Sequence, residues 1–115
     1  MKRGEIYYAH LDPTVGEETK KKRPVLIVSN NSNNHVANTI TIVPITSNIK
    51  KIYPFEVFLE SIETGLLHDS KAQCHQIRTI SQLRIHRPIP IGIVKYPTME
   101  KINSALKLHL DIKDY

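Results

Sequence analysis

Arg23 and Thr46 combine side-chain types and neighbours that could do chemistry on a phosphate. Arg23 directly precedes Pro24, whose ring fixes the backbone, and the apolar, β-branched run that follows should enter a core. Thr46 ends a second apolar run, and another hydroxyl, Ser47, comes directly after it. A cation and a hydroxyl at the ends of neighbouring strands could grip a phosphodiester and stabilise the negative charge that develops on it. RNA is therefore the first substrate to consider.

Cleavage of RNA without a metal needs the 2′-hydroxyl to attack its own phosphorus while charge is stabilised and protons are moved. Arg23 can donate parallel hydrogen bonds to the nonbridging oxygens, but an always-charged guanidinium is a poor base. Thr46 can bind the phosphate or orient the nucleophile. Glu18, in an acidic segment, is a candidate general base, although a solvated loop carboxylate is the more ordinary interpretation.

Other side chains near this pair in the sequence could hold the RNA. The segment after Thr46 mixes amide, cationic and aromatic groups, which suits splayed single-stranded bases, although a polar hairpin connection would look the same. Gln76 and Arg78 could line an RNA groove or instead join the sheet and a dimer interface. The predicted RNA-binding residues are Lys22, Ser47, Asn48, Lys50, Tyr53, Gln76 and Arg78.

The 6 histidines suggest a two-histidine ribonuclease mechanism, because imidazole titrates near neutral pH. They are scattered along the chain, however, and the sequence places no two of them together. The same scatter argues against a zinc site, which needs closely spaced ligands. We therefore expect no catalytic histidine pair, no metal and no cofactor.

The composition favours one small domain with a polyanionic partner. A chain of 115 residues suits a single domain spanning residues 1–115. Sixteen Lys and Arg against 11 Asp and Glu give a formal charge of +5, which favours salt-sensitive binding to nucleic acid. The start of the chain lacks the apolar core of a signal peptide, and no run reaches transmembrane length. A soluble cytoplasmic protein without a membrane partner is expected.

The elements that must position these residues are mostly short strands. Alternating or continuous apolar runs predict strands at 4–10, 24–29, 39–46, 55–59, 72–79 and 90–94, with the second buried on both faces. We expect a mobile loop at 14–22, a turn at 30–34, a polar loop at 47–54 and one helical turn at 81–84.

The last segment changes to helical spacing. Thr98 is the predicted N-cap of a helix whose apolar stripe, for the core or a dimer interface, is Met99, Ile102, Leu106 and Leu110. Many short strands followed by one helix predict a mainly β protein: a curved antiparallel sheet or partly open barrel with a C-terminal helix.

In its motifs the chain resembles the MazF/PemK family of toxin endoribonucleases. The resemblance rests on five pieces in the family's order, which together cover nearly the whole chain: residues 3–8 (RGEIYY), 16–18 (GEE), 23–28 (RPVLIV), 45–46 (IT) and 76–80 (QIRTI). It implies an SH3-like barrel, a homodimer and a cognate antitoxin. It also implies metal-independent cleavage of single-stranded mRNA at a short sequence, leaving 2′,3′-cyclic phosphate and 5′-hydroxyl ends, with Arg23 and Thr46 as the catalytic pair.

Two other functions fit the same kind of barrel. A related toxin class with this shape inhibits DNA gyrase by binding it, and a simple RNA-binding barrel would hold strands without cutting them. Arg23 and Thr46 discriminate, because a gyrase inhibitor has no use for a phosphate-stabilising arginine beside a hydroxyl.

Overall fold

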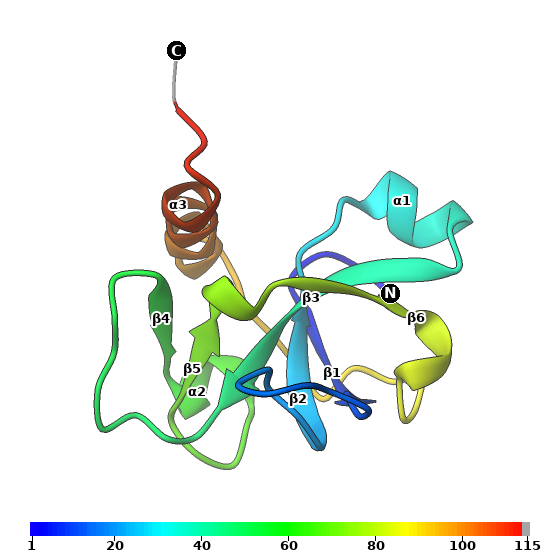
Figure 1. The fold of residues 1–115 in the computed structure, drawn as a ribbon, viewed down its shortest axis with the longest axis horizontal. Coiled ribbons are helices and arrows are strands. Elements are labelled where there is room, and N and C mark those ends of the chain that lie inside the picture. The colour runs from blue at the N-terminus through cyan, green and yellow to red at the C-terminus, as the bar shows by residue number, and fades with distance from the viewer. Residues whose placement is uncertain (114–115) are drawn as a thin grey trace.

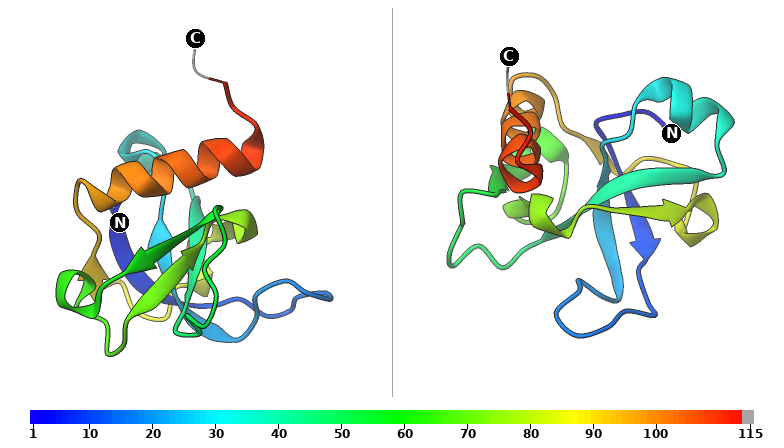
Figure 2. Two further views of the ribbon diagram at one scale, coloured as in Figure 1. Left: turned by 90° about the vertical axis from the view of Figure 1, so that its left-hand side faces the viewer. Right: turned by 45° about the horizontal axis from the view of Figure 1, so that its top comes forward.

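The fold is a curled antiparallel sheet with a long helix across it (Figures 1 and 2). The computed structural model describes residues 1–113. The strands are β1 (Glu5–His10), β2 (Lys22–Ile27), β3 (Thr39–Thr46), β4 (Glu56–Leu59), β5 (Ser70–Gln73), β6 (Arg78–Ser81) and β7 (Gly92–Ile93). The helices are α1 (Asn31–Val36), α2 (Ser61–Thr64) and α3 (Thr98–Leu110), with 3-10 turns η1 (Cys74–Gln76) and η2 (Gln82–Arg84). The predicted mainly β class with a C-terminal helix is confirmed.

Strand β3 is where the sheet curls. Along the order β4-β5-β3-β2-β1-β7 every pairing is antiparallel, and β6 joins β3 outside that path. The start of β3 pairs with β6, whereas its last residues, Ile45 and Thr46, pair with β5. One strand therefore serves two differently directed parts of the sheet, which produces a partly open half-barrel.

The strands β1 and β2 are buried on both faces, as predicted for 24–29. Adjacent residues point to opposite sides of a strand, so Ile6 and Leu26 enter one core while Tyr7 and Val25 enter the other. Each buried aliphatic side chain of this kind contributes roughly 1.5–3 kcal/mol to folding. The two cores hold the ends of β2 and β3 in place from both sides.

Helix α3 covers the first of these cores and lies against β4 and η1 (Figure 2). Met99, Ile102 and Ala105 are buried, whereas Leu110 remains 50% exposed and so extends the predicted stripe beyond the core. The predicted N-cap is wrong by one residue: Pro97 is the cap, and the Thr98 hydroxyl instead donates to Glu63 Oε1 at 2.8 Å. The Thr98 hydroxyl therefore bonds to a carboxylate on α2 instead of capping its own helix.

Three other segments differ from the sequence prediction. Residues 72–79 form no single strand, because β5 and β6 pair with opposite halves of β3 and η1 must turn the chain between them. The predicted turn at 30–34 opens α1, whose first turn is capped by Asn30 Oδ1 accepting from Asn33 N at 2.8 Å. Helix α2 was not predicted.

One glycine allows α2 to approach the sheet closely. A Cβ at Gly92 would lie 1.8 Å from the carbonyl oxygen of Thr64, so only glycine fits where β7 passes α2. Thr64 itself is buried. Along residues 1–113 there is no helix with the length and apolar character needed to cross a bilayer.

Candidate active site

The register of β2 and β3 brings Arg23 and Thr46 together. The pairing of β2 with β3 ends where Val25 lies opposite Pro44, so Arg23 near the start of β2 and Thr46 at the end of β3 both lie just beyond this last pair. Both residues line a pocket of about 260 Å³ that the β1–β2 loop completes with Glu17 and Glu18. The structure therefore joins the two residues that the sequence singled out, although they are far apart in the chain.

Arg23 is fixed by a hydrogen bond at its Nε, and its two terminal amino groups have no hydrogen-bond partner within residues 1–113. Its Nε donates to the carbonyl oxygen of Lys20 at 2.9 Å, which fixes the direction of the guanidinium. Across residues 1–113 it takes part in no ion pair. Its terminal amino groups are therefore available for two parallel hydrogen bonds to an anion such as a phosphate.

Thr46 is oriented by the turn that follows it. Its Oγ1 accepts from the backbone N of Asn48 at 3.2 Å, and Asn48 Oδ1 in turn accepts from the backbone N of Lys50 at 3.3 Å. An oxygen that accepts from its own turn keeps its proton free for donation. Thr46 can therefore donate a hydrogen bond to a phosphate oxygen in the pocket.

Glu18 lines the same pocket but also has a local role. Its Oε1 accepts from the backbone N of Val15 at 2.7 Å, within the β1–β2 loop. The neighbouring Glu17 also lines the pocket. Both carboxylates therefore share the pocket with Arg23 and Thr46.

Gln76 and Arg78 fasten the β1–β2 loop from the outside of the pocket. The Gln76 side chain accepts from the backbone N of Thr19 and donates to the carbonyl oxygen of Glu17, each at 3.2 Å. Arg78 donates to the carbonyl oxygen of Leu11 at 3.2 Å. The sequence left two roles open for Gln76 and Arg78: lining an RNA groove or joining parts of the structure. These contacts support the second role, and they position the loop that carries Glu17 and Glu18.

The remaining predicted RNA-binding residues divide into two groups. Lys22 and Ser47 line a hollow that adjoins the pocket and shares Arg23 with it. Asn48, Lys50 and Tyr53 do not line that pocket. Tyr53 instead stacks on Phe55 at a ring-centroid distance of 5.4 Å.

Gln73 and Thr19 complete the pocket and were not predicted from the sequence. Thr19 Oγ1 donates to Gln73 Oε1 at 3.0 Å, and both residues line the pocket beside Arg23. Nothing local marks them, since Thr19 lies in an aperiodic loop and Gln73 ends a short strand. Only the three-dimensional closure of the loop onto β5 reveals them.

The histidines are less scattered than the sequence suggested. The rings of His10 and His86 lie 5.5 Å apart, and those of His75 and His109 lie 6.5 Å apart. Burial is the main cause that lowers the pKa of His75. None of the four lines the Arg23 pocket, and across residues 1–113 no group of three or more metal-ligating side chains is arranged to hold an ion.

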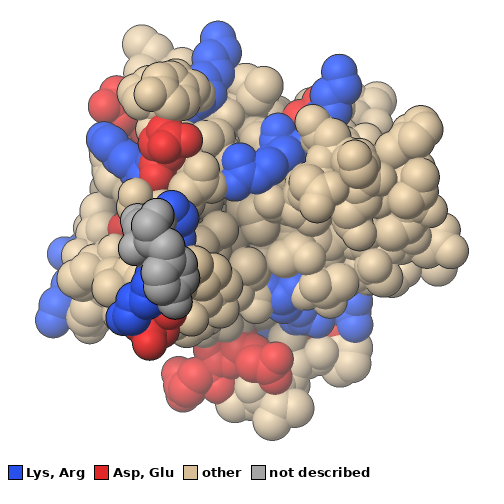
Figure 3. All heavy atoms as spheres, turned by 90° about the horizontal axis from the view of Figure 1, so that it is seen from above, with Lys and Arg blue, Asp and Glu red and all other residues tan. Residues whose placement is uncertain are grey.

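The net positive charge is not gathered into one patch on the face seen in Figure 3. Carboxylates collect at its lower edge, and the Lys and Arg side chains stand in small groups separated by wide uncharged areas. A strongly salt-dependent nucleic-acid contact needs several cations along one path. The site must therefore be located by specific pockets and not by overall charge.

Comparison with known proteins gives one consistent result. Residues 2–110 match the family described as "PemK-like, MazF-like toxin of type II toxin-antitoxin system". Endoribonuclease MazF9 of Mycobacterium tuberculosis is 47% identical over 117 residues, covering 97% of this chain and 98% of the relative. Endoribonuclease EndoA of Bacillus subtilis is 34% identical over 116 residues, covering 100% of this chain and 98% of the relative.

The fold comparison agrees. An endoribonuclease from a Mycobacterial species, solved in complex with its cognate antitoxin, aligns with a TM-score of 0.81 at 25% identity, over 100% of this chain and 99% of that one. MazF from Deinococcus radiodurans aligns with a TM-score of 0.82 at 23% identity, over 97% of both chains. The half-barrel with its C-terminal helix is thus a known architecture.

Proposed function

The chain belongs to the PemK-like, MazF-like toxin family of type II toxin-antitoxin systems, and from this premise we propose that it is an endoribonuclease acting on single-stranded RNA. The observation that carries the proposal is that Arg23 and Thr46 line the same pocket. Relatives with 47% and 34% identity, both named endoribonucleases, support it.

The reaction is an attack by the ribose 2′-oxygen on the adjacent phosphorus. A new P–O2′ bond forms, the P–O5′ bond breaks, and the products carry a 2′,3′-cyclic phosphate and a 5′-hydroxyl. The two terminal amino groups of Arg23 donate hydrogen bonds to the nonbridging oxygens and stabilise the negative charge that develops there. Thr46 donates to the same phosphate and aligns it for in-line attack.

Two proton transfers complete the reaction. Glu18 is our candidate for accepting the 2′-hydroxyl proton, because it lies in the pocket on a loop that can adjust to the substrate. The leaving 5′-oxygen must gain a proton, and Arg23, already bound at the phosphate, is the nearest donor to it in this arrangement. Neither transfer uses a metal ion in this mechanism.

The test is cleavage of a long, end-labelled transcript by the purified protein in excess EDTA. Discrete fragments that end in cyclic phosphate and begin with a 5′-hydroxyl are the expected products. Intact RNA would contradict the proposal, and intact RNA together with inhibition of DNA gyrase would identify the binding toxin class instead. Cleavage that stops on EDTA addition and returns with Mg²⁺ would contradict metal independence alone.

The assembly we propose is a cytoplasmic homodimer neutralised by a cognate antitoxin. The exposed apolar residues Leu108, Leu110 and Ile112, at the end of α3, offer part of a dimer surface. The antitoxin follows from the family, and one structural relative is solved with its own. A monomeric mass at micromolar concentration by light scattering would contradict the dimer.

A further inference from the structure

A second hollow, distinct from the Arg23–Thr46 pocket, lies beside β1. It measures about 370 Å³ and is lined by Tyr8, Lys22, His86, Arg87, Ile89 and Ile91. Tyr8 and Lys22 also line a hollow of about 220 Å³ that contains Arg23 and Ser47. Arg23, in turn, also lines the pocket that contains Thr46. Shared residues thus place the three hollows next to one another around the first residues of β2, where the adjacent Lys22 and Arg23 face opposite sides of the strand.

The outer wall of the hollow beside β1 is fixed to the sheet. The backbone N of His86 donates to the carbonyl oxygen of Tyr8, and that of Ile91 donates to the carbonyl oxygen of Ile6, each at 2.8 Å. Arg84 Nη1 also donates to the carbonyl oxygen of Asp12 at 2.6 Å. The segment that carries Arg87 is therefore bonded on both sides of that residue, and the hollow exists before any ligand arrives.

The two outer hollows carry basic side chains and no carboxylate. Lys22 Nζ lies 5.5 Å from the centroid of the Tyr8 ring, and none of the residues lining either outer hollow is an Asp or a Glu. The pKa of His86 is lowered mainly by the charge of Lys22, and further by burial and by the charges of Arg87 and His10. Lys22 and Arg87 have no ion-pair partner within residues 1–113, so their charge is available to an anion.

The same hollow also has apolar walls. The Tyr8 ring is 39% exposed, and Ile89 beside it is 67% exposed. A site for a phosphate ion alone has no need of an exposed ring and isoleucine. Aromatic rings that stack bases beside cations that follow the backbone are the usual components of single-strand binding.

We propose that this hollow is a nucleotide subsite for RNA that flanks the cleaved bond. The exposed Tyr8 ring stacks on a base, and Lys22 and Arg87 bind the phosphate that precedes or follows it. This inference rests on the proposed endoribonuclease function and extends it, because the RNA then contacts the protein well beyond the Arg23–Thr46 pair. The hollow shares no lining residue with the Arg23–Thr46 pocket, so the subsite is separate from the site of the cleaved phosphate.

The test compares two RNAs that share one cleavage sequence. One contains only that sequence, and the other extends it on both sides. We expect the wild-type protein to prefer the extended RNA in kcat/KM. Tyr8→Ala should lower kcat/KM for the extended RNA roughly tenfold, mainly through KM, and reduce that preference. Arg87→Ala should lower kcat/KM for the extended RNA severalfold. It should also weaken the salt dependence of RNA binding by the equivalent of about one released counterion.

The controls remove matching groups elsewhere. Lys101→Ala deletes one cation on α3, and Tyr96→Ala deletes a ring that is 77% exposed. Neither should alter the preference for the extended RNA. Tyr8→Phe keeps the ring and should retain that preference, whereas Tyr8→Ala loses it. Arg87 is exposed, so its variant tests the subsite even if the Tyr8 variants fold poorly.

A binding measurement separates this proposal from the enzymatic one. Fluorescence anisotropy with 2′-O-methyl RNA, which cannot be cleaved, reports the subsite directly. If the wild type cleaves neither RNA yet Arg87→Ala weakens binding of the extended strand, the function fails and the subsite stands. If the wild type cleaves both RNAs and the Tyr8 and Arg87 variants leave the preference for the extended RNA unaltered, the subsite is refuted.

Discussion

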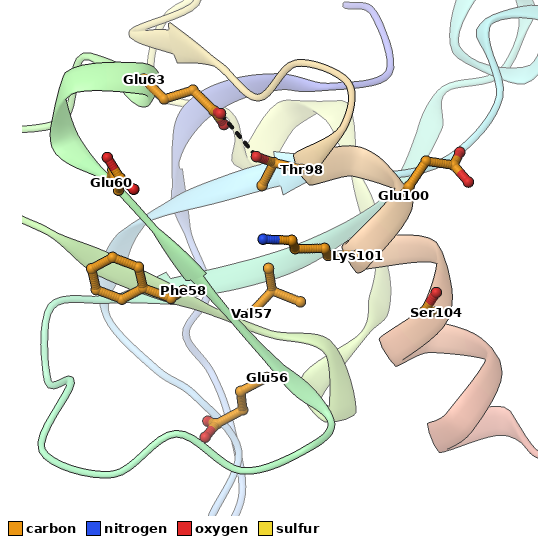
Figure 4. Close-up of a pocket in the computed structure, with 9 residues that line it drawn as sticks. All are labelled: Glu56, Val57, Phe58, Glu60, Glu63, Thr98, Glu100, Lys101 and Ser104. Atoms are coloured by element: carbon orange, nitrogen blue, oxygen red, sulfur yellow. Dashed lines mark hydrogen bonds between the residues drawn. The ribbon is translucent and has the colours of Figure 1, made fainter.

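The Arg23–Thr46 pocket and the groove between β4 and α3 differ in their balance of charge, because two basic and two acidic side chains line the pocket whereas one lysine stands among the glutamates of the groove. The groove is the larger of the two, at about 510 Å³, and four glutamates line it: Glu56, Glu60, Glu63 and Glu100. Figure 4 places Glu60 and Glu63 on one side and Glu100 with Lys101 on the helix side. The Arg23 pocket is only about 260 Å³. Size alone would point to the groove, but a carboxylate-lined surface repels RNA, so charge decides against it.

The two regions also differ in how their polar groups are used. At the groove, Lys71 pairs with Glu56 at 3.0 Å and Thr98 donates to Glu63 Oε1 at 2.8 Å, whereas the buried Glu63 Oε2 has no hydrogen-bond partner within residues 1–113. In the pocket, Arg23 keeps its terminal amino groups unpaired within residues 1–113. A buried ion pair such as Lys71–Glu56 is part of the fold, whereas unpaired guanidinium donors at a cavity can bind an anion. Variants near β4 should therefore change stability, and variants in the pocket should change activity.

The largest effect should come from Lys71→Met. The side chains of Lys71 and Glu56 are 10% and 2% exposed, and Lys71 Nζ also donates to the carbonyl oxygen of Lys51 at 2.6 Å. Removing the cation leaves a buried carboxylate unpaired, so the free energy of unfolding should fall by about 3–5 kcal/mol. Urea denaturation measures it. Lys113→Met, which breaks an exposed pair with Asp111, should change it by less than about 1 kcal/mol.

Arg23→Ala should abolish most activity without that loss of stability. Removing a preformed donor to a developing oxyanion costs roughly 10²- to 10³-fold in rate. Single-turnover cleavage of labelled RNA gives the rate, and urea denaturation gives the stability. Arg23→Lys should recover little, because an ammonium cannot donate two parallel bonds. A folded Arg23→Ala protein with normal turnover would remove Arg23 from the mechanism.

Thr46→Ala should have a somewhat smaller effect. A hydrogen bond to a charged phosphate contributes about 1.5–3 kcal/mol, so kcat/KM should fall roughly 10- to 100-fold. Thr46→Ser keeps the hydroxyl and should stay near the wild-type value, while Thr46→Val keeps the shape and should behave like alanine. Equal activity of the serine and valine variants would show that the hydroxyl is not used.

Gln76→Ala should test whether the loop matters to the pocket. The substitution deletes both hydrogen bonds by which this side chain holds the β1–β2 loop, each contributing about 0.5–1.5 kcal/mol. We expect kcat/KM to fall roughly three- to tenfold. Gln82→Ala is the matched control, because Gln82 donates to the carbonyl oxygen of Ala37 at 2.9 Å, away from the pocket. Similar losses in both variants would mean a general loosening of the fold.

The comparison of the two regions also explains what could be predicted from the sequence. Arg23 and Thr46 were predictable because each ends an apolar run, and antiparallel neighbours bring such ends together. The contacts of Gln76 with the loop join residues separated by 57 and 59 positions, and no local pattern marks such contacts. Residues 72–79 were misread for the same reason, because only pairing with both halves of β3 divides them.

The smallest effect should come from neutralising the groove with Glu60→Gln. Glu60 is exposed and lines the groove but not the Arg23 pocket, so screening at physiological salt should leave little of its field at that pocket. KM for RNA should fall less than about twofold, and the free energy of unfolding should stay within about 0.5 kcal/mol. Steady-state cleavage at low and physiological salt measures the first quantity. If KM fell severalfold at both salt concentrations, RNA would pass close to the carboxylates of the groove, and the restriction of RNA binding to the Arg23 pocket and the hollows beside it would be wrong.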